Sequence, residues 1–237
     1  MNDPLARGGV RRYLDTVTPE EYWPNIGEVN LQEMTLTGLA DLFGSDKGPL
    51  KHRYTKVYER IVADMIRTEG LPRHQCVFEI AEAGVACGAS LHMWAHYLPA
   101  SAITGYDIRP ECGELCKGLE NVTIEIVDLC KQSPSNCMYD LFIDDASHIS
   151  EQMVQMFDRV WEHIRPGGYY IIEDLRCTYN EGYTNQFRQH FDRNAMNFRS
   201  TLMDFMDRLM RDVDARASIE EMNYYPQLLV LKKVEYE

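Results

Sequence analysis

The sequence predicts an α/β fold in which a mostly parallel sheet carries helices on both faces and ends in an antiparallel hairpin. From residue 76 onward, short apolar runs alternate with amphipathic helical patterns. Strands that alternate with helices form parallel sheets, because each helix carries the chain back to the start of the next strand. The end of the chain departs from this alternation, since two strand-like runs are joined there by Tyr225-Pro226-Gln227, which is typical of a hairpin.

The expected sheet has seven strands. Apolar runs predict strands at 76–81, 102–106, 122–127, 141–143, 169–172, 218–224 and 228–234. Helical patterns cover 54–67, 90–97, 110–118, 150–164 and 185–213, whereas residues 1–50 are polar and irregular until the apolar piece at 36–43. The segment 150–164 shows the pattern well, because Met153, Met156, Phe157 and Val160 recur at helical spacing. The turn at 165–168 is expected to introduce the fifth strand.

The composition fits a globular protein and argues against two classes of partner. The 237 residues include 24 Lys+Arg and 37 Asp+Glu, which gives a net charge of −13, and 45% are hydrophobic. An acidic chain repels nucleic acid and anionic membranes unless basic residues gather in a patch. The only adjacent basic pairs are Arg11-Arg12 and Lys232-Lys233, so we expect neither nucleic acid nor membrane as a partner.

The sequence also predicts a cytoplasmic protein with one core. It shows no signal peptide and no apolar stretch of membrane-spanning length. The seven cysteines occur singly, without a C-x-x-C pair, which disfavours a disulfide framework or a structural zinc site. The loop at 44–49 divides residues 1–50, expected to be a cover or lid, from a main domain at 51–237.

Acidic residues follow the first three strands, at the sheet edge where open parallel sheets bind their ligands. The first strand leads through Glu82 and Gly84 to Ser90, which is a plausible helix N-cap. Gly84 permits a tight turn and the close approach of a ligand. Asp107 ends the second strand about 20 residues later, where a carboxylate can accept hydrogen bonds from ribose hydroxyls. Asp128 ends the third strand and could contact an adenine amino group. Each alone is more often a solvated strand end, but together they favour an adenosine ligand.

Four carboxylates and an imidazole follow the next two strands. They are Asp144, Asp145, His148, Glu173 and Asp174. Neighbouring strands lie about 4.8 Å apart, and crowded carboxylates repel unless a cation or a proton neutralises them. Because the set is rich in oxygen and lacks cysteine, the expected cation is Mg²⁺, or else Mn²⁺ or Ca²⁺. The alternative is that Asp144 caps a helix while Glu173 and Asp174 face solvent.

These segments resemble the class I S-adenosylmethionine-dependent methyltransferases, and in particular the Mg²⁺-dependent O-methyltransferases that methylate deoxysugars on macrolides and related natural products. The matching segments are Asp46-Lys47-Gly48 with His52 and Tyr54, Glu82-Ala83-Gly84 through Trp94, Gly105-Tyr106-Asp107, Ile143 through His148, and Arg165 through Leu175. The Asp-Asp-x-Ser-His and Glu-Asp-Leu pair is the specific part. The resemblance implies a Rossmann-like class I methyltransferase fold.

The resemblance also implies roles for individual residues. S-adenosylmethionine would be bound by Glu82, Gly84, Ser90, Asp107 and Asp128, together with Lys47, His52 and Tyr54. The metal would be bound by Asp145, Glu173 and Asp174, and catalysis would use His148, as the base, with Asp145. Ala89 departs from the family pattern, because many of these enzymes carry a second glycine there.

The function that the resemblance implies is divalent-metal-dependent O-methylation of a hydroxyl, on a sugar of a small-molecule natural product such as an antibiotic. Residues 51–237 would then be the catalytic domain, and a homo-oligomer is left open. One alternative is a metal-independent, carboxyl-directed or phenol-directed methyltransferase, and another is a non-catalytic binding protein with this fold. A dehydrogenase is disfavoured, because the first loop lacks the G-x-G-x-x-G pattern.

Overall fold

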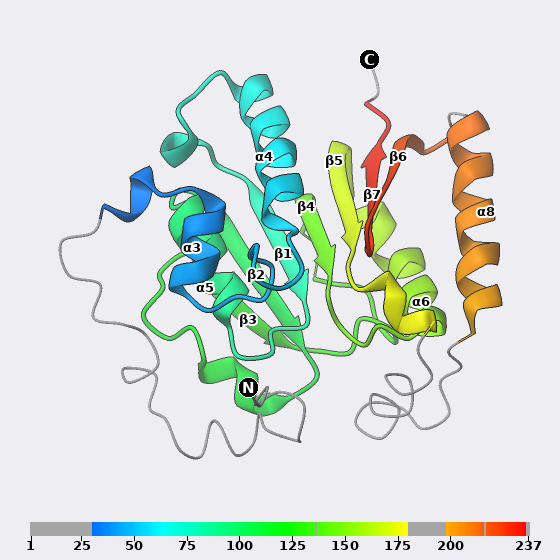
Figure 1. The fold of residues 1–237 in the computed structure, drawn as a ribbon, viewed down its shortest axis with the longest axis horizontal. Coiled ribbons are helices and arrows are strands. Elements are labelled where there is room, and N and C mark those ends of the chain that lie inside the picture. The colour runs from blue at the N-terminus through cyan, green and yellow to red at the C-terminus, as the bar shows by residue number, and fades with distance from the viewer. Residues whose placement is uncertain (1–29, 136, 180–197, 216, 236–237) are drawn as a thin grey trace.

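The fold is a seven-stranded sheet between two layers of helices (Figure 1). The computed structural model describes residues 30–135, 137–179, 198–215 and 217–235. The strands are β1 (Glu79–Ala83), β2 (Ala102–Asp107), β3 (Val122–Ile126), β4 (Tyr139–Asp144), β5 (Ile164–Ile172), β6 (Ile219–Tyr225) and β7 (Leu228–Lys233). Their order is β3-β2-β1-β4-β5-β7-β6, and β7 runs antiparallel to both of its neighbours. This confirms the predicted parallel sheet with a C-terminal hairpin.

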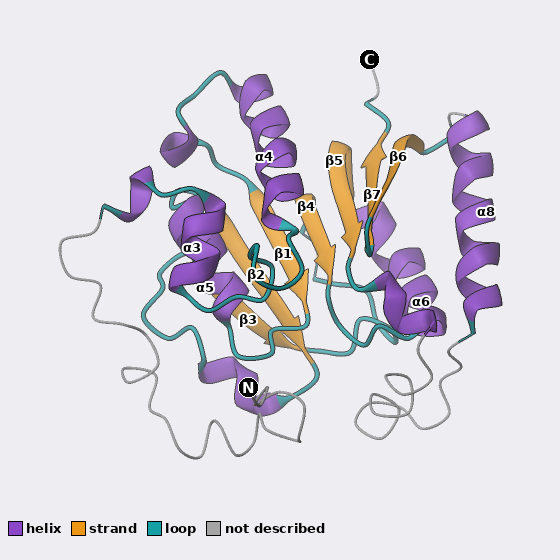
Figure 2. Ribbon diagram, viewed as in Figure 1, coloured by secondary structure: helices purple, strands orange, loops and turns teal. Residues whose placement is uncertain are grey.

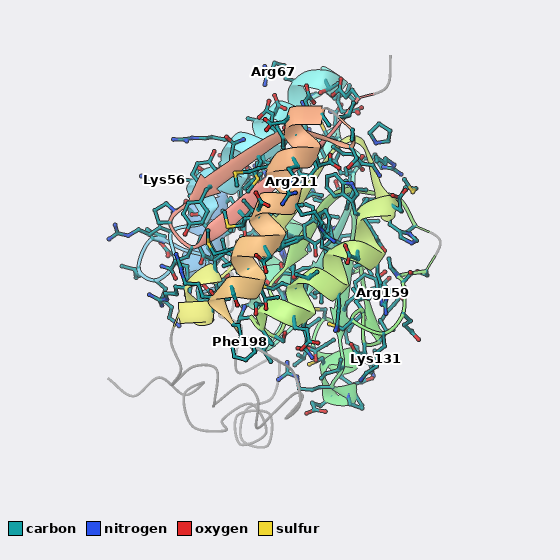
Figure 3. The ribbon with its side chains drawn as sticks, turned by 90° about the vertical axis from the view of Figure 1, so that its right-hand side faces the viewer. Lys56, Arg67, Lys131, Arg159, Phe198 and Arg211 are labelled. Carbon is teal, nitrogen blue, oxygen red and sulfur yellow. The ribbon has the colours of Figure 1, made fainter. Side chains whose placement is uncertain are left out.

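Helices cover both faces of the sheet (Figure 2). They are α3 (Leu36–Leu42), α4 (Thr55–Glu69), α5 (Ala89–Tyr97), α6 (Ser150–Val160) and α8 (Arg199–Ala215). One layer holds α3, α4 and α5, whereas α6 and α8 lie side by side over the other face (Figure 3). Within the described ranges, no helix has the length and apolar character needed to cross a membrane.

Several predicted boundaries were wrong in part. The strand predicted at 76–81 is observed as Glu79–Ala83. The segment 110–118 forms a short 3-10 helix, Pro110–Glu114, in place of a longer helix. The helix predicted for 150–164 ends at Val160, and β5 begins at Ile164, because Ile164 pairs with Tyr139 and the predicted turn at 165–168 is part of the strand. For the helix predicted at 185–213, the structure shows Arg199–Ala215, and 185–197 lie outside the described residues.

The alternation of side chains along each strand divides the core in two. Ile80 and Ile143 pack beneath α3, α4 and α5, whereas Ala81 and Phe142 face α6 and α8. Successive strand residues point to opposite faces, and all four side chains are buried, as expected for parallel strands covered on both sides. The same alternation decides on which face each strand-end carboxylate lies.

The described part of the N-terminal cover is joined to the main core. The side chain of Thr35 caps α3 by accepting a hydrogen bond from the Gly38 N–H. Leu36 and Leu39 on this helix are fully buried and pack in the same cluster as α4 and α5. The division between a cover at 1–50 and a catalytic domain at 51–237 stays a prediction, and residues 1–29 lie outside the described residues.

Replacing Leu39 by alanine should therefore destabilise the whole protein. Leu39 has no exposed surface, and truncating such a side chain costs about 2 to 5 kcal/mol of unfolding free energy. Chemical denaturation followed by circular dichroism measures this loss. The control is Leu50→Ala, because Leu50 is 90% exposed and its loss should change stability by less than about 0.5 kcal/mol. An unchanged Leu39→Ala midpoint would show that α3 is not part of the cooperative core.

Candidate functional site

Three acidic side chains meet where β1, β4 and β5 end. Glu82 lies on β1 opposite Ile143 of β4, which in turn lies opposite Ile171 of β5. Asp145 and Glu173 come directly after β4 and β5. Their backbone N–H groups continue the sheet, since Asp145 donates to the Ala83 carbonyl at 3.0 Å and Glu173 to the Asp144 carbonyl at 3.0 Å. The parallel ladder therefore brings the three carboxylates to one edge.

The ammonium of Lys47 lies among these three carboxylates. Lys47 belongs to the loop between α3 and α4, which crosses in front of the sheet (Figure 1). Its Nζ lies 2.6 Å from Asp145 Oδ2, 2.8 Å from Glu173 Oε1 and 3.5 Å from Glu82 Oε1. Lys47 is only 1% exposed. Burial lowers the pKa of Lys47, but the neighbouring carboxylates raise it well above its ordinary value, so the side chain stays charged. We call these four residues the Lys47 cluster.

A second group, the acid–imidazole corner, consists of Asp145, His148 and Asp174. Each offers one ligand atom, and these atoms lie within 4.8 Å of one another. His148 Nε2 lies 3.8 Å from Asp145 Oδ1 and 4.0 Å from Asp174 Oδ2. His148 and Asp174 both have left-handed backbones, with φ of 55° and 54°. Non-glycine residues in this conformation are uncommon and cluster at functional sites.

Asp174 is surrounded by positively polarised groups. The Tyr54 hydroxyl donates to Asp174 Oδ1 at 2.6 Å, and His52 Nδ1 lies 3.2 Å from the same oxygen. Burial raises the pKa of Asp174, but the hydrogen bond from His52 and the charge of His148 lower it by more, so it lies well below its usual range. Asp174 is therefore ionised and suited to bind a cation.

Asp144 does not join this corner, contrary to the sequence expectation. It is only 3% exposed, and its position in β4 places it on the Phe142 face, towards α6 and Tyr170. Burial raises the pKa of Asp144 to about 7, and the backbone N–H of Ala146 hydrogen-bonds its Oδ1 at 3.4 Å. Asp144 is the last residue of β4 and keeps the orientation of that strand, whereas Asp145 lies beyond the strand and turns towards His148. The alternative, in which Glu173 faces solvent, is also excluded, because Glu173 is 2% exposed.

The first loop packs tightly against the corner. A Cβ added to Gly84, whose φ is +99°, would lie 2.1 Å from the carbonyl oxygen of Asp145. The sequence predicted that Ser90 caps α5, but this was wrong, because Gly88 holds the N-cap position. The Ser90 hydroxyl instead donates to Glu82 Oε1. Glu82 Oε2 has no hydrogen-bond partner although the residue is fully buried, which leaves one acceptor available for a ligand.

The next two predicted residues are both engaged by the protein itself. Asp107 Oδ2 accepts from the Val85 N–H at 3.0 Å and from Arg109 Nη2 at 2.8 Å, so it ties the first loop to the end of β2. Burial raises the pKa of Asp107, but its hydrogen bonds and ion pair with Arg109 bring it below its ordinary value. Asp128 Oδ1 accepts from the Cys130 N–H at 3.0 Å and closes its own turn.

The structure thus brings together most of the predicted site. Lys47 contacts Asp145 and Glu173, whereas His52 and Tyr54 contact Asp174. All three lie next to the expected metal carboxylates. Sequence reasoning missed Tyr58, whose hydroxyl donates to Glu173 Oε1, and Arg109. Tyr58 lies one helical turn after Tyr54, so the shared face of α4 was a signal for it.

Comparison with known proteins agrees with the fold. No family model matches the chain. The chain is 31% identical over 176 residues to 8-demethyl-8-α-L-rhamnosyl tetracenomycin-C 2′-O-methyltransferase of Streptomyces olivaceus, which covers 71% of this chain and 45% of the relative. It is 30% identical over 164 residues to mycinamicin VI 2″-O-methyltransferase of Micromonospora griseorubida, covering 64% and 38%. The chain spans less than half the length of these curated relatives.

Among solved structures, the MycE methyltransferase from the mycinamycin biosynthetic pathway, in complex with Mg and SAH, superposes with a TM-score of 0.65. The match covers 85% of this chain and 55% of MycE at 23% identity, so it shows that the two chains share a fold. The chain has the class I methyltransferase fold, and its sequence relatives are O-methyltransferases of sugar-bearing natural products.

Proposed function

We propose that the protein is an S-adenosylmethionine-dependent O-methyltransferase that uses a divalent cation to methylate a sugar hydroxyl on a small-molecule natural product. One observation carries the proposal: the unpartnered Glu82 Oε2 and the acid–imidazole corner lie at adjacent strand ends of a methyltransferase fold. The names of the relatives support a sugar acceptor. We further propose residues 51–237 as the catalytic domain and the cytoplasm as the location; a homo-oligomer stays a prediction.

The donor atoms of the corner fit a hard divalent cation. Asp145 Oδ1 and Asp174 Oδ2 are carboxylate oxygens that lie near each other around His148. Mg²⁺, Mn²⁺ and Ca²⁺ prefer such oxygens, and Mg²⁺ usually needs only one or two protein carboxylates. We propose Asp145 and Asp174 as ligands, with Glu173 in support through its bonds to Lys47 and Tyr58. The imidazole of His148 then remains for proton transfer.

The residues of the first loop fit the cofactor. The buried Glu82 Oε2 is an acceptor suited to an ammonium group, and its partner Oε1 is held by Ser90. The glycine at position 84 lets the first loop pack directly against the Asp145 backbone, which brings the proposed cofactor and metal subsites together. Asp107 and Asp128 would hold the ribose and adenine, and for Asp107 this requires sharing or displacing Arg109.

In this proposal a methyl group is transferred to the acceptor hydroxyl, and the proton of that hydroxyl is transferred to a side chain of the protein. When bound, the sulfonium supplies an electrophilic methyl group and the divalent cation lowers the pKa of a neighbouring hydroxyl. Glu82 and the first loop would hold the methyl donor, which would give its methyl group to the acceptor oxygen and keep the electron pair of the broken carbon–sulfur bond. The hydroxyl proton passes to Nε2 of His148, which is the ring nitrogen that faces the corner. Asp145 and Asp174 lie beside this nitrogen and stabilise the imidazolium.

A metal-independent methyltransferase is the second candidate, because Lys47 already places a positive charge against Asp145 and Glu173. Isothermal titration with S-adenosylmethionine and its demethylated product, together with turnover of 8-demethyl-8-α-L-rhamnosyl tetracenomycin C, separates the alternatives. We expect cofactor binding, and turnover that EDTA abolishes and excess Mg²⁺ restores. Full turnover in EDTA would favour the metal-independent enzyme, and failure to bind either form of the cofactor would favour a non-catalytic protein.

A further inference from the structure

The two proposed metal carboxylates each divide their oxygens between the loop at 46–54 and the corner. Asp174 Oδ1 accepts from Tyr54 at 2.6 Å, whereas Asp174 Oδ2 faces His148. Asp145 Oδ2 accepts from Lys47 at 2.6 Å, whereas Asp145 Oδ1 faces His148. The loop therefore engages one oxygen of each carboxylate and leaves the other towards the same point.

Tyr54 is buried and is held by contacts on several sides. It is only 2% exposed, its N–H donates to the Lys47 carbonyl at 2.9 Å, and its ring stacks on His52 with centroids 5.3 Å apart. Its hydroxyl donates to Asp174 Oδ1 and lies 3.4 Å from the Asp174 N–H, which donates to it. This two-way contact holds both the carboxylate and the left-handed backbone of Asp174.

We infer that Tyr54 is a positioning residue for the metal, and that it acts by orienting Asp174 so that Oδ2 alone faces the cation. The inference rests on the proposed metal-dependent function. It differs from the role that the resemblance implied, in which Tyr54 binds S-adenosylmethionine. The contacts of Tyr54 run to Asp174, His52, Tyr58 and the Lys47 backbone. Partners that orient a metal ligand typically contribute 10- to 100-fold to metal affinity, because a ligand left free must be ordered by the metal itself.

The test compares two tyrosine-to-phenylalanine variants of the full chain. Tyr54→Phe removes the hydroxyl that bonds Asp174 at 2.6 Å, and Tyr169→Phe removes the one that bonds Asp64 at 2.5 Å. Mn²⁺ affinity is measured by electron paramagnetic resonance without cofactor, and S-adenosylhomocysteine affinity by calorimetry without metal. We expect Tyr54→Phe to weaken Mn²⁺ binding by about 10-fold or more and to leave S-adenosylhomocysteine binding within about twofold of the wild type. Tyr169→Phe should change neither affinity.

Three other results would overturn the inference, each in a recognisable way. If wild-type protein does not bind Mn²⁺, the metal-dependent function itself fails. If the wild type binds Mn²⁺ and Tyr54→Phe binds it equally well, only the positioning role fails. If Tyr54→Phe weakens S-adenosylhomocysteine and spares Mn²⁺, the loop serves the cofactor. Thermal unfolding of both variants, with binding measured well below the midpoint, separates these results from a loss of folded protein.

Discussion

Alanine in place of Gly84 should destabilise the protein by about 3 to 5 kcal/mol and remove S-adenosylhomocysteine binding. The φ of +99° is a conformation that side chains rarely adopt, and the new Cβ would lie 2.1 Å from the Asp145 carbonyl oxygen. A strained backbone angle costs about 1 to 3 kcal/mol, and overpacking adds a similar amount. Since the obstacle is backbone, it cannot rotate away as a side chain would. Relief requires the first loop and the Asp145 segment to separate, which would disturb both proposed subsites.

Gly118 provides a matched control for this substitution. Its φ of +98° is nearly the same, and a Cβ built there would have nothing within 4 Å. Gly118→Ala should therefore show the cost of the backbone angle alone, about 1 to 2 kcal/mol. Urea denaturation of both variants, with calorimetric titration of S-adenosylhomocysteine, gives the comparison. Equal losses of stability in the two variants would mean that the contact between Gly84 and Asp145 has no energetic consequence.

The second large effect concerns the proposed proton transfer to His148. His148→Asn should reduce turnover by about 10²- to 10⁴-fold, the usual contribution of a general base, and should leave S-adenosylhomocysteine binding within about threefold of the wild type. Asparagine is the chosen replacement because it tolerates the left-handed backbone at this position, where φ is 55°. The loss should fall on kcat, because the imidazole is not among the proposed ligands of the cofactor.

The control for this variant is His163→Asn. His163 lies after α6, where its Nδ1 is 3.1 Å from the Cys137 carbonyl oxygen, and it plays no part in the proposed site. Turnover is measured with 8-demethyl-8-α-L-rhamnosyl tetracenomycin C and saturating Mg²⁺. If His148→Asn keeps wild-type kcat, another group or solvent accepts the proton. If it instead loses Mn²⁺ binding, His148 is a metal ligand.

The sequence predicted the parallel sheet and the gathering of strand-end carboxylates because both follow from local pattern. Apolar runs identified the strands, and the alternation with helices implied that their carboxyl ends share one edge. An error of one residue in where a strand ends changes which side chain reaches the site at such an edge. Asp144 and Asp145 are indistinguishable in the run Leu141 to His148, yet only Asp145 lies beyond the last strand position and can turn towards Glu82 and Glu173.

The contacts of the N-terminal loop could not be derived from such patterns. Lys47 meets Asp145 and Glu173 across 98 and 126 residues of chain, and no local periodicity encodes a contact of that range. Ser90 shows the same limit at short range. A serine near a helix start is a good capping candidate, but Gly88 holds the cap and the Ser90 hydroxyl bonds a carboxylate on β1.

The long separation between Lys47 and its partners has a consequence for how the chain folds during synthesis. Lys47 leaves the ribosome early, and Glu173 follows 126 residues later. At about 5 to 20 residues per second, the lysine is made several seconds or more before its last partner. An ammonium buried without a counter-charge costs several kcal/mol, so the loop between α3 and α4 gains little from docking early. Closure of the site should therefore wait until β5 has joined the sheet and Glu173 is in place.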